Sequence, residues 1–169
     1  MRNFGKTNMK IKRVGFGGIP IQRITQEDTN KVVDELINQG VNFIDTARGY
    51  TVSEEYIGNA LEGRREKFYI ATKSMSRGYE DMKKDIDISL KNLKTDYIDL
   101  YQIHNLKADE YDTIFDDNKA YKALLEAKEG VRIWSAITRI AISCCLSFPY
   151  SVPDIAAIAF SIGWNTSVS

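Results

Sequence analysis

The chain has 169 residues, with 23 basic residues (Lys and Arg) against 23 acidic ones (Asp and Glu), so its formal net charge is zero. This length suits one domain with a substantial core, and the balanced charge predicts no electrostatic affinity for nucleic acid or an anionic membrane. The first twenty residues lack the apolar segment of a secretory signal, which predicts a cytoplasmic protein. The two cysteines, Cys144 and Cys145, are adjacent, a spacing that suits neither a disulfide framework nor a metal site.

Charged residues become rare after Gly130. Residues 131–169 contain only Arg132, Arg139 and Asp154, and are rich in Ile, Ser and Ala. This change of composition divides the chain into residues 1–130 and an atypical tail of low charge.

The first part of the chain alternates between strand and helix patterns. Residues 13–18 predict a short strand that closes in a glycine turn. Thr25 can cap the free N–H groups of a helix that ends at Gly40. Residues 41–44 predict a second strand, and Ser53 is expected to cap a second helix.

Two more strand and helix pairs follow. Residues 68–72 predict the third strand and residues 97–103 the fourth, while apolar residues at helical spacing predict helices over 80–94 and 120–128. An acidic loop over 109–118 precedes the last of these helices. Four successive strand–helix pairs joined by short links favour a parallel sheet.

Two parallel α/β architectures compete for this pattern. A doubly wound sheet calls for a glycine-rich dinucleotide fingerprint, but residues 15–20 lack its third glycine and place Pro20 where the phosphate-binding helix would begin. A (β/α)8 TIM barrel calls for polar functional residues at the C-terminal ends of its strands. Asp45, Lys73 and His104 each follow a predicted strand. The sequence therefore predicts a barrel of this type, truncated to about four units.

Asp45, Tyr50, Lys73 and His104 would converge at the mouth of such a barrel. A nearby ammonium stabilises a phenolate, so Lys73 can help Tyr50 to release a proton, and Asp45 can hold Lys73 charged. His104 can donate a hydrogen bond to a substrate oxygen. Such a set polarises a carbonyl and delivers a proton, and the missing hydride implies a nicotinamide cofactor. Each residue alone also has an ordinary structural explanation, so the prediction depends on the joint pattern.

Residues 1–130 resemble the N-terminal half of an aldo-keto reductase. The motifs that carry the resemblance are GFGG at 15–18, FIDTA at 43–47 followed by Tyr50, ATK at 71–73 and DYIDLYQIH at 96–104. Residues 18–23 are similar to a branch of the family that adds a C-terminal iron–sulfur domain, although the chain has no cluster-binding cysteine spacing.

The resemblance implies a role for each site residue. It identifies Asp45, Tyr50, Lys73 and His104 as the catalytic tetrad of an NAD(P)H-dependent oxidoreductase that reduces an aldehyde or ketone to an alcohol, with Tyr50 as the general acid. It places three residues near the nicotinamide of NADP(H), or alternatively of NAD(H): Gly17, Gly18 and Thr46. It also places Asn105 beside a small carbonyl substrate.

The tail departs from the family pattern, because no motif for the cofactor phosphates follows Gly130. Its uncharged runs, 140–153 and 155–169, are shorter than the ~20 residues that span a membrane. A replacement module is one interpretation, but we favour loss of the reading frame near codon 130. Residues 131–138 could form a fifth strand, and 155–162 a short helix or strand. A partial barrel exposes sheet edges and inner apolar residues, which predicts self-association. The alternative function is thus an inactive aldo-keto reductase fragment or interaction module.

Overall fold

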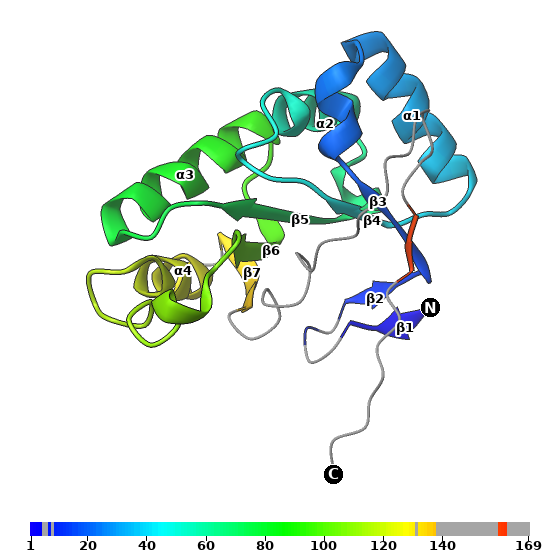
Figure 1. Cartoon of the computed structure of the whole chain (residues 1–169). Coiled ribbons are helices and arrows are strands. Elements are labelled where there is room, and N and C mark those ends of the chain that lie inside the picture. The colour runs from blue at the N-terminus through cyan, green and yellow to red at the C-terminus, as the bar shows by residue number, and fades with distance from the viewer. Residues whose placement is uncertain (5–6, 8, 131, 138–158, 162–169) are drawn as a thin grey trace.

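A six-stranded sheet organises the computed structural model, which describes residues 1–4, 7, 9–130, 132–137 and 159–161 (Figure 1). The strands run across the sheet in the order β7-β6-β5-β4-β3-β8. Their bounds are β3 Val14–Gly17, β4 Phe43–Asp45, β5 Tyr69–Ser74, β6 Ile98–Ile103, β7 Ile133–Ile137 and β8 Ala159–Ser161. Neighbouring strands from β3 to β7 pair in parallel, and β8 pairs antiparallel with β3.

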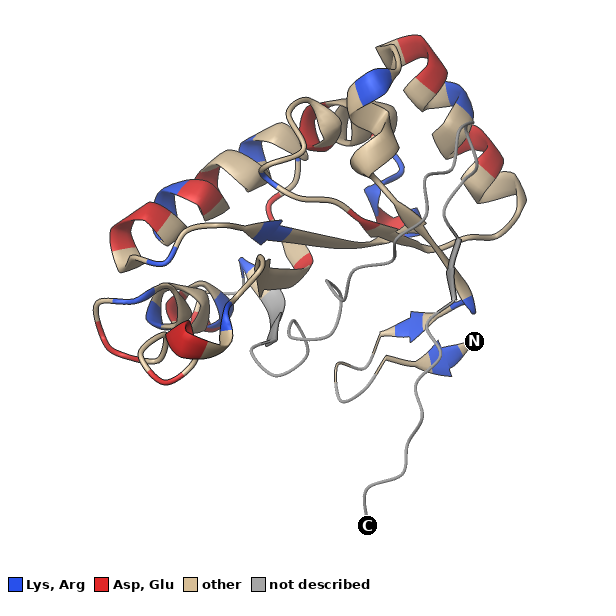
Figure 2. Ribbon diagram, viewed as in Figure 1, with Lys and Arg blue, Asp and Glu red and all other residues tan. Residues whose placement is uncertain are grey.

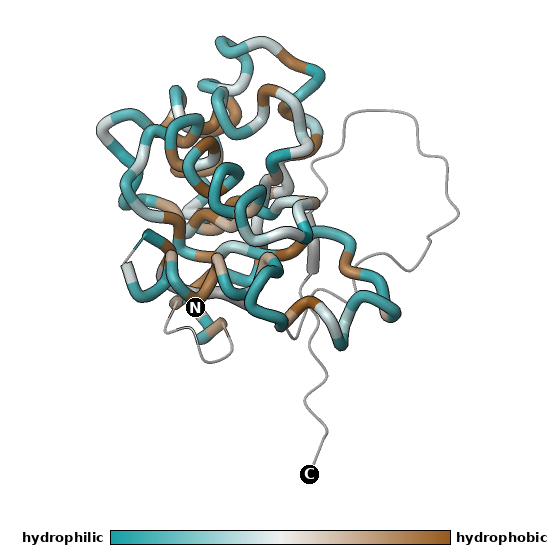
Figure 3. The backbone as a smooth tube through the Cα atoms, turned by 90° about the vertical axis from the view of Figure 1, so that its left-hand side faces the viewer, coloured by the Kyte–Doolittle hydropathy of each residue, from teal (hydrophilic) through white to brown (hydrophobic). Residues whose placement is uncertain are grey.

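Helices follow the parallel strands in turn. They are α1 Gln26–Asn38, α2 Ser53–Ala60, α3 Tyr79–Asn92 and α4 Ala120–Glu129, with short 3-10 turns η1 Ile19–Arg23, η2 Arg65–Lys67 and η3 Ala108–Glu110. Acidic and basic residues are interspersed along α1 and α3 (Figure 2), and the helical turns alternate between hydrophilic and hydrophobic residues (Figure 3). The apolar stripes pack against the sheet in one large core.

The ends of the helices follow from local chemistry, with one exception. The Thr25 hydroxyl accepts a hydrogen bond from the Asp28 N–H, which confirms the predicted cap. Gly40 and Gly63 adopt φ angles of +66° and +73°, which suit glycine. The predicted cap at Ser53 is wrong, because Ser53 is the first residue of α2 and its hydroxyl donates to the Gly18 carbonyl instead.

A small hairpin, β1 Arg2–Asn3 and β2 Lys10–Ile11, packs against the face of the sheet opposite the helices. Met9 and Ile11 form a second apolar cluster with Phe43, Ala71 and Leu100, and all five residues are buried. The sequence reading missed this hairpin and therefore expected these inner residues to be exposed. That expectation is wrong for Phe43, Ala71 and Leu100.

The predicted α/β architecture is confirmed: four parallel strands alternate with four helices, as in part of a TIM barrel. The fifth strand considered for residues 131–138 is present as β7, which pairs in parallel with β6. The expected unpaired edge of β3 is covered by β8 over Val14–Phe16. Apart from β8, the expectations for residues 138–169 lie outside the described residues. None of the helices in the described part of the chain is long and apolar enough to cross a membrane.

Candidate active site

Three of the predicted catalytic residues lie at the C-terminal ends of adjacent parallel strands. Asp45 ends β4, Lys73 is the penultimate residue of β5, and His104 directly follows β6. Successive side chains along a strand point to opposite faces of the sheet. The Thr72 hydroxyl donates a hydrogen bond to Glu54 of α2, so Thr72 faces the helices. The next side chain, Lys73, therefore points to the inner face of the sheet. The strand ends therefore bring the three side chains to one rim.

Lys73 and Asp45 form an ion pair across β4 and β5. The Lys73 ammonium donates to Asp45 Oδ2 at 2.6 Å and to the carbonyl oxygen of Thr46 at 2.8 Å. The Lys73 side chain is only 11% exposed, whereas that of Asp45 is 37% exposed. A nearly buried ammonium needs such partners to remain charged. The pair thus fixes a positive charge at the inner rim of the sheet.

Tyr50 reaches the same rim from the loop between β4 and α2. The Lys73 nitrogen lies 5.2 Å from the centroid of the Tyr50 ring, within the range of a cation–π contact. The rings of Tyr50 and His104 meet edge to face, with centroids 5.9 Å apart and planes at 87°. The structure therefore brings together all four residues predicted for the tetrad.

The environment of His104 favours its neutral form. Burial lowers the pKa of the imidazole first, and the positive charge of Lys73 lowers it further, while Asp45 opposes the shift and Arg77 adds to it. Within the described part of the chain, Nδ1 of His104 is buried without a hydrogen-bond partner. A neutral imidazole with a free ring nitrogen can bond to a polar ligand.

The three residues predicted beside the cofactor differ in what surrounds them. Gly17 pairs with Asp45 in the sheet register and adds no side chain at that point of the rim. At Gly18 a Cβ atom would lie 2.9 Å from Ser53 Oγ and 3.2 Å from the Asp45 carbonyl oxygen, so a side chain there would force its neighbours to shift. Thr46 is fully buried, and its hydroxyl lies 2.9 Å from Ser53 Oγ.

The three residues also differ in their place on the rim. Gly17 lies opposite Asp45, the residue that pairs with Lys73. Gly18 and Thr46 are instead joined through Ser53 and hold the first turn of α2 against β3. Asn105, predicted beside the substrate, is exposed and directly follows His104 with φ +50°.

Sequence reasoning missed a buried polar network behind the rim, centred on Glu54. This carboxylate is 1% exposed and accepts hydrogen bonds from four side chains: Arg48, Thr72, Ser89 and Asn92. Arg48 lies two residues before Tyr50, and its N–H donates to the Lys73 carbonyl at 2.9 Å. The network therefore ties the Tyr50 loop to β5 and α3. An acid in the first turn of a helix gives no sequence signal of burial, because such acids usually face solvent.

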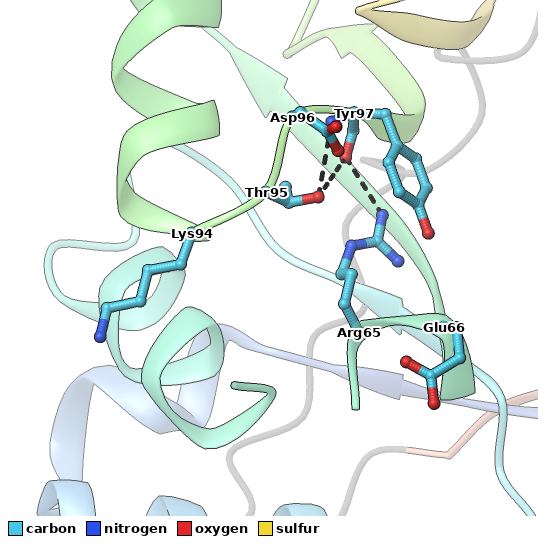
Figure 4. Close-up of a pocket in the computed structure, with 6 residues that line it drawn as sticks. All are labelled: Arg65, Glu66, Lys94, Thr95, Asp96 and Tyr97. Atoms are coloured by element: carbon cyan, nitrogen blue, oxygen red, sulfur yellow. Dashed lines mark hydrogen bonds between the residues drawn. The ribbon is translucent and has the colours of Figure 1, made fainter. Parts of the chain in front are cut away.

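A surface hollow lies at the opposite ends of the strands (Figure 4). Arg65 and Tyr97 line it, with the guanidinium carbon 4.3 Å from the ring centroid, and Arg65 also donates to buried Asp99 at 2.6 Å. TIM-barrel active sites lie at the C-terminal ends of the strands, so this hollow is separate from the candidate site. The described residues contain no group of three or more His, Cys, Asp or Glu side chains placed to hold a metal ion.

Comparison with known proteins gives a consistent match. The model of the Aldo/keto reductase family matches residues 13–136. L-galactose dehydrogenase from Arabidopsis thaliana is 33% identical over 129 residues, which cover 68% of this chain and 40% of that protein. The chain spans less than half the length of the curated relatives that it matches first.

Solved structures support the fold. The holo form of aldo-keto reductase AKR11C1 from Bacillus halodurans superposes with a TM-score of 0.71 at 28% identity, covering 80% of this chain and 48% of that one. An aldo-keto reductase from Klebsiella pneumoniae in complex with NADPH gives a TM-score of 0.66 at 22% identity, covering 75% and 44%. At that identity the second likeness concerns the fold alone. Nothing in these matches supports the branch with an iron–sulfur domain.

Proposed function

The chain belongs to the aldo/keto reductase family, and on this basis we propose that it reduces an aldehyde or ketone to an alcohol with hydride from NADP(H). The observation that carries the proposal is the convergence of Asp45, Tyr50, Lys73 and His104 at one rim of the sheet. An acid, a phenol, an ammonium and a neutral imidazole are the groups that carbonyl reduction needs.

Each residue has a distinct task in this proposal. A bound nicotinamide cofactor would supply the hydride that the carbonyl carbon needs. Tyr50 gives its hydroxyl proton to the carbonyl oxygen, and the adjacent ammonium of Lys73 stabilises the phenolate left behind. Asp45 keeps Lys73 charged and in place. Neutral His104 donates a hydrogen bond to the carbonyl oxygen, which polarises the substrate and orients it toward Tyr50.

Gly17 is our proposed neighbour of the nicotinamide ring, since it leaves the rim beside Asp45 free of a side chain. Gly18 and Thr46 would lie near the nicotinamide end of the cofactor and help to shape the rim there, since both contact Ser53 at the start of α2. NADP(H) is the preferred cofactor in this proposal, and NAD(H) is the alternative. Asn105 would lie beside the substrate.

Fluorescence titration of NADPH with the full chain tests cofactor binding. A saturable change in NADPH fluorescence supports the proposal, and the same titration with NADH measures the preference between the two cofactors. No change at high protein concentration would favour the alternative function, a non-catalytic fragment or interaction module. The proposed loss of reading frame near codon 130 has its own test: one of the other two frames of the DNA should continue the family pattern.

We also propose that the chain self-associates through the outer strands of its sheet, β7 and β8, because an edge strand presents backbone groups that can pair with another chain. Size-exclusion chromatography over a range of protein concentrations tests this. A monomer at every concentration would contradict it.

A further inference from the structure

One arginine joins two of the loops at the candidate site. Arg77 lies between β5 and α3, and its side chain is 24% exposed. Its Nη2 donates to the carbonyl oxygens of His104 and Asn105, at 3.0 and 2.9 Å. Its Nη1 donates to the Met75 carbonyl at 2.9 Å, within its own loop. The guanidinium therefore fastens the segment that follows Lys73 to the segment that follows β6.

The same guanidinium also binds a carboxylate further along the second loop. Arg77 Nε donates to Glu110 Oε2 at 3.0 Å, and this oxygen also accepts from the Lys107 N–H at 2.9 Å. The Lys107 N–H, followed by the contact with Arg77, lowers the pKa of Glu110, so the carboxylate is ionised near neutral pH. Arg77 and Glu110 thus hold the start and the end of the segment 104–110 together.

The backbone turns sharply at this point. Asn105 has φ +50°, a left-handed conformation that is uncommon for non-glycine residues and that asparagine adopts more readily than most. The turn aims the carbonyls of His104 and Asn105 at one guanidinium nitrogen. Only arginine offers five N–H donors in a planar fork, which suits three carbonyls and a carboxylate at once. A lysine at position 77 could supply the charge but not this geometry.

We propose that Arg77 is a positioning residue, which fixes the backbone of His104 so that its imidazole stays edge-on to the Tyr50 ring. The significance of this role rests on the proposed function, since His104 is there the group that orients the carbonyl. The role concerns the arrangement of the His104 and Tyr50 rings, and this arrangement can be measured without catalytic turnover. Arg77 acts through the His104 backbone, because its guanidinium donates to the His104 carbonyl.

The test uses the fact that His104 is the only histidine in the chain. Its imidazole signals in an NMR spectrum of the full chain are therefore assigned without ambiguity. The Tyr50 ring imposes a ring-current shift on them, and Tyr50→Leu gives the reference value without that ring. Among the described residues, the charged and titratable groups that face the imidazole are Lys73, Asp45, Tyr50 and Arg77.

Arg77→Gln is expected to move the imidazole signals toward the Tyr50→Leu reference and to raise the His104 pKa toward its ordinary value. Arg77→Lys should keep the titration midpoint closer to that of the unmodified chain, because the charge remains, and should still lose the ring-current shift. Arg23→Gln, at an exposed arginine on η1, is the matched control and should change neither. Identical signals in Arg77→Gln and Arg23→Gln would overturn the proposal. So would a change of midpoint with the ring-current shift intact.

Glu110→Gln is a second variant that tests the same role if Arg77→Gln fails to fold. It removes the carboxylate partner of Arg77 and should move the imidazole signals in the same direction to a smaller extent, so unchanged signals in this variant would overturn the proposal. The NADPH titration stays independent of these spectra. If NADPH does not bind but Arg77→Gln shifts the imidazole, the proposed function fails and the positioning role stands.

Discussion

The ammonium of Lys73 lies 2.6 Å from a carboxylate oxygen of Asp45, although the two residues are 28 positions apart in the chain. The contact exists because β4 and β5 are neighbouring parallel strands whose C-terminal ends meet at one edge of the sheet. It joins a nearly buried cation to a partly exposed anion.

This difference in exposure predicts unequal effects of removing either partner. Asp45→Asn removes the negative charge beside the buried ammonium and should lower the free energy of unfolding by about 1–2 kcal/mol, reduced by the solvent access of Asp45. Lys73→Met removes the buried charge and leaves a solvated carboxylate, so it should cost less. Urea unfolding of both variants measures this, and a larger loss in Lys73→Met would contradict it.

Glu54 gives a second prediction on stability. Glu54→Ala leaves four polar side chains without their shared acceptor in a buried site and should cost about 3–5 kcal/mol. Glu55→Ala changes the next residue, which is exposed, and should stay within about 0.5 kcal/mol of the unmodified chain. Thermal and urea unfolding compare the pair. Similar stability of the two variants would refute the structural role of Glu54.

Close packing of α2 against the end of α3 depends on Gly58. A Cβ atom there would lie 2.2 Å from the Asn92 carbonyl oxygen and 2.7 Å from the Leu93 backbone, which cannot move aside as a side chain can. Gly58→Ala should therefore destabilise the chain by about 3 kcal/mol or more. Gly49→Ala is the control, since a Cβ atom at Gly49 meets nothing within 4 Å. Equal unfolding midpoints would contradict the packing described for α2.

The lowered pKa of His104 predicts how stability depends on pH. Because the folded state disfavours the protonated imidazole, the unfolded chain binds more protons, and the free energy of unfolding falls as the pH drops below the ordinary value of 6.5. His104→Gln should flatten the profile between about pH 8 and about pH 5.5, where few other side chains titrate. Equilibrium unfolding across this range measures both proteins, and parallel profiles would contradict the assignment.

The sequence predicted which residues lie at the strand ends better than it predicted the contacts that hold them there. Apolar runs that end at Asp45, Lys73 and His104 place these residues on strand ends, because parallel strands share one C-terminal edge. Ser53 had the local pattern of a helix cap, but a tertiary contact with the Gly18 carbonyl uses its hydroxyl instead.

Other features were beyond local patterns. The hairpin β1–β2 has two residues in each strand, too few for a periodic signal. The burial of Glu54 depends on residues from β5, α3 and the Tyr50 loop, so no local pattern could indicate it. Likewise, nothing in the local sequence distinguishes Arg77 from other loop arginines, because only the fold places it beside His104.

Turnover by the Tyr50→Phe variant tests the central claim most directly. The full chain should oxidise NADPH in the presence of an aldehyde, and Tyr50→Phe should lower kcat by about 10²–10⁴-fold, the usual contribution of a general acid, with the Kd for NADPH unchanged. Tyr56→Phe, at a half-buried tyrosine of α2, is the matched control and should keep its activity. Equal kcat values for the unmodified chain and Tyr50→Phe, or no turnover by the unmodified chain, would contradict the account.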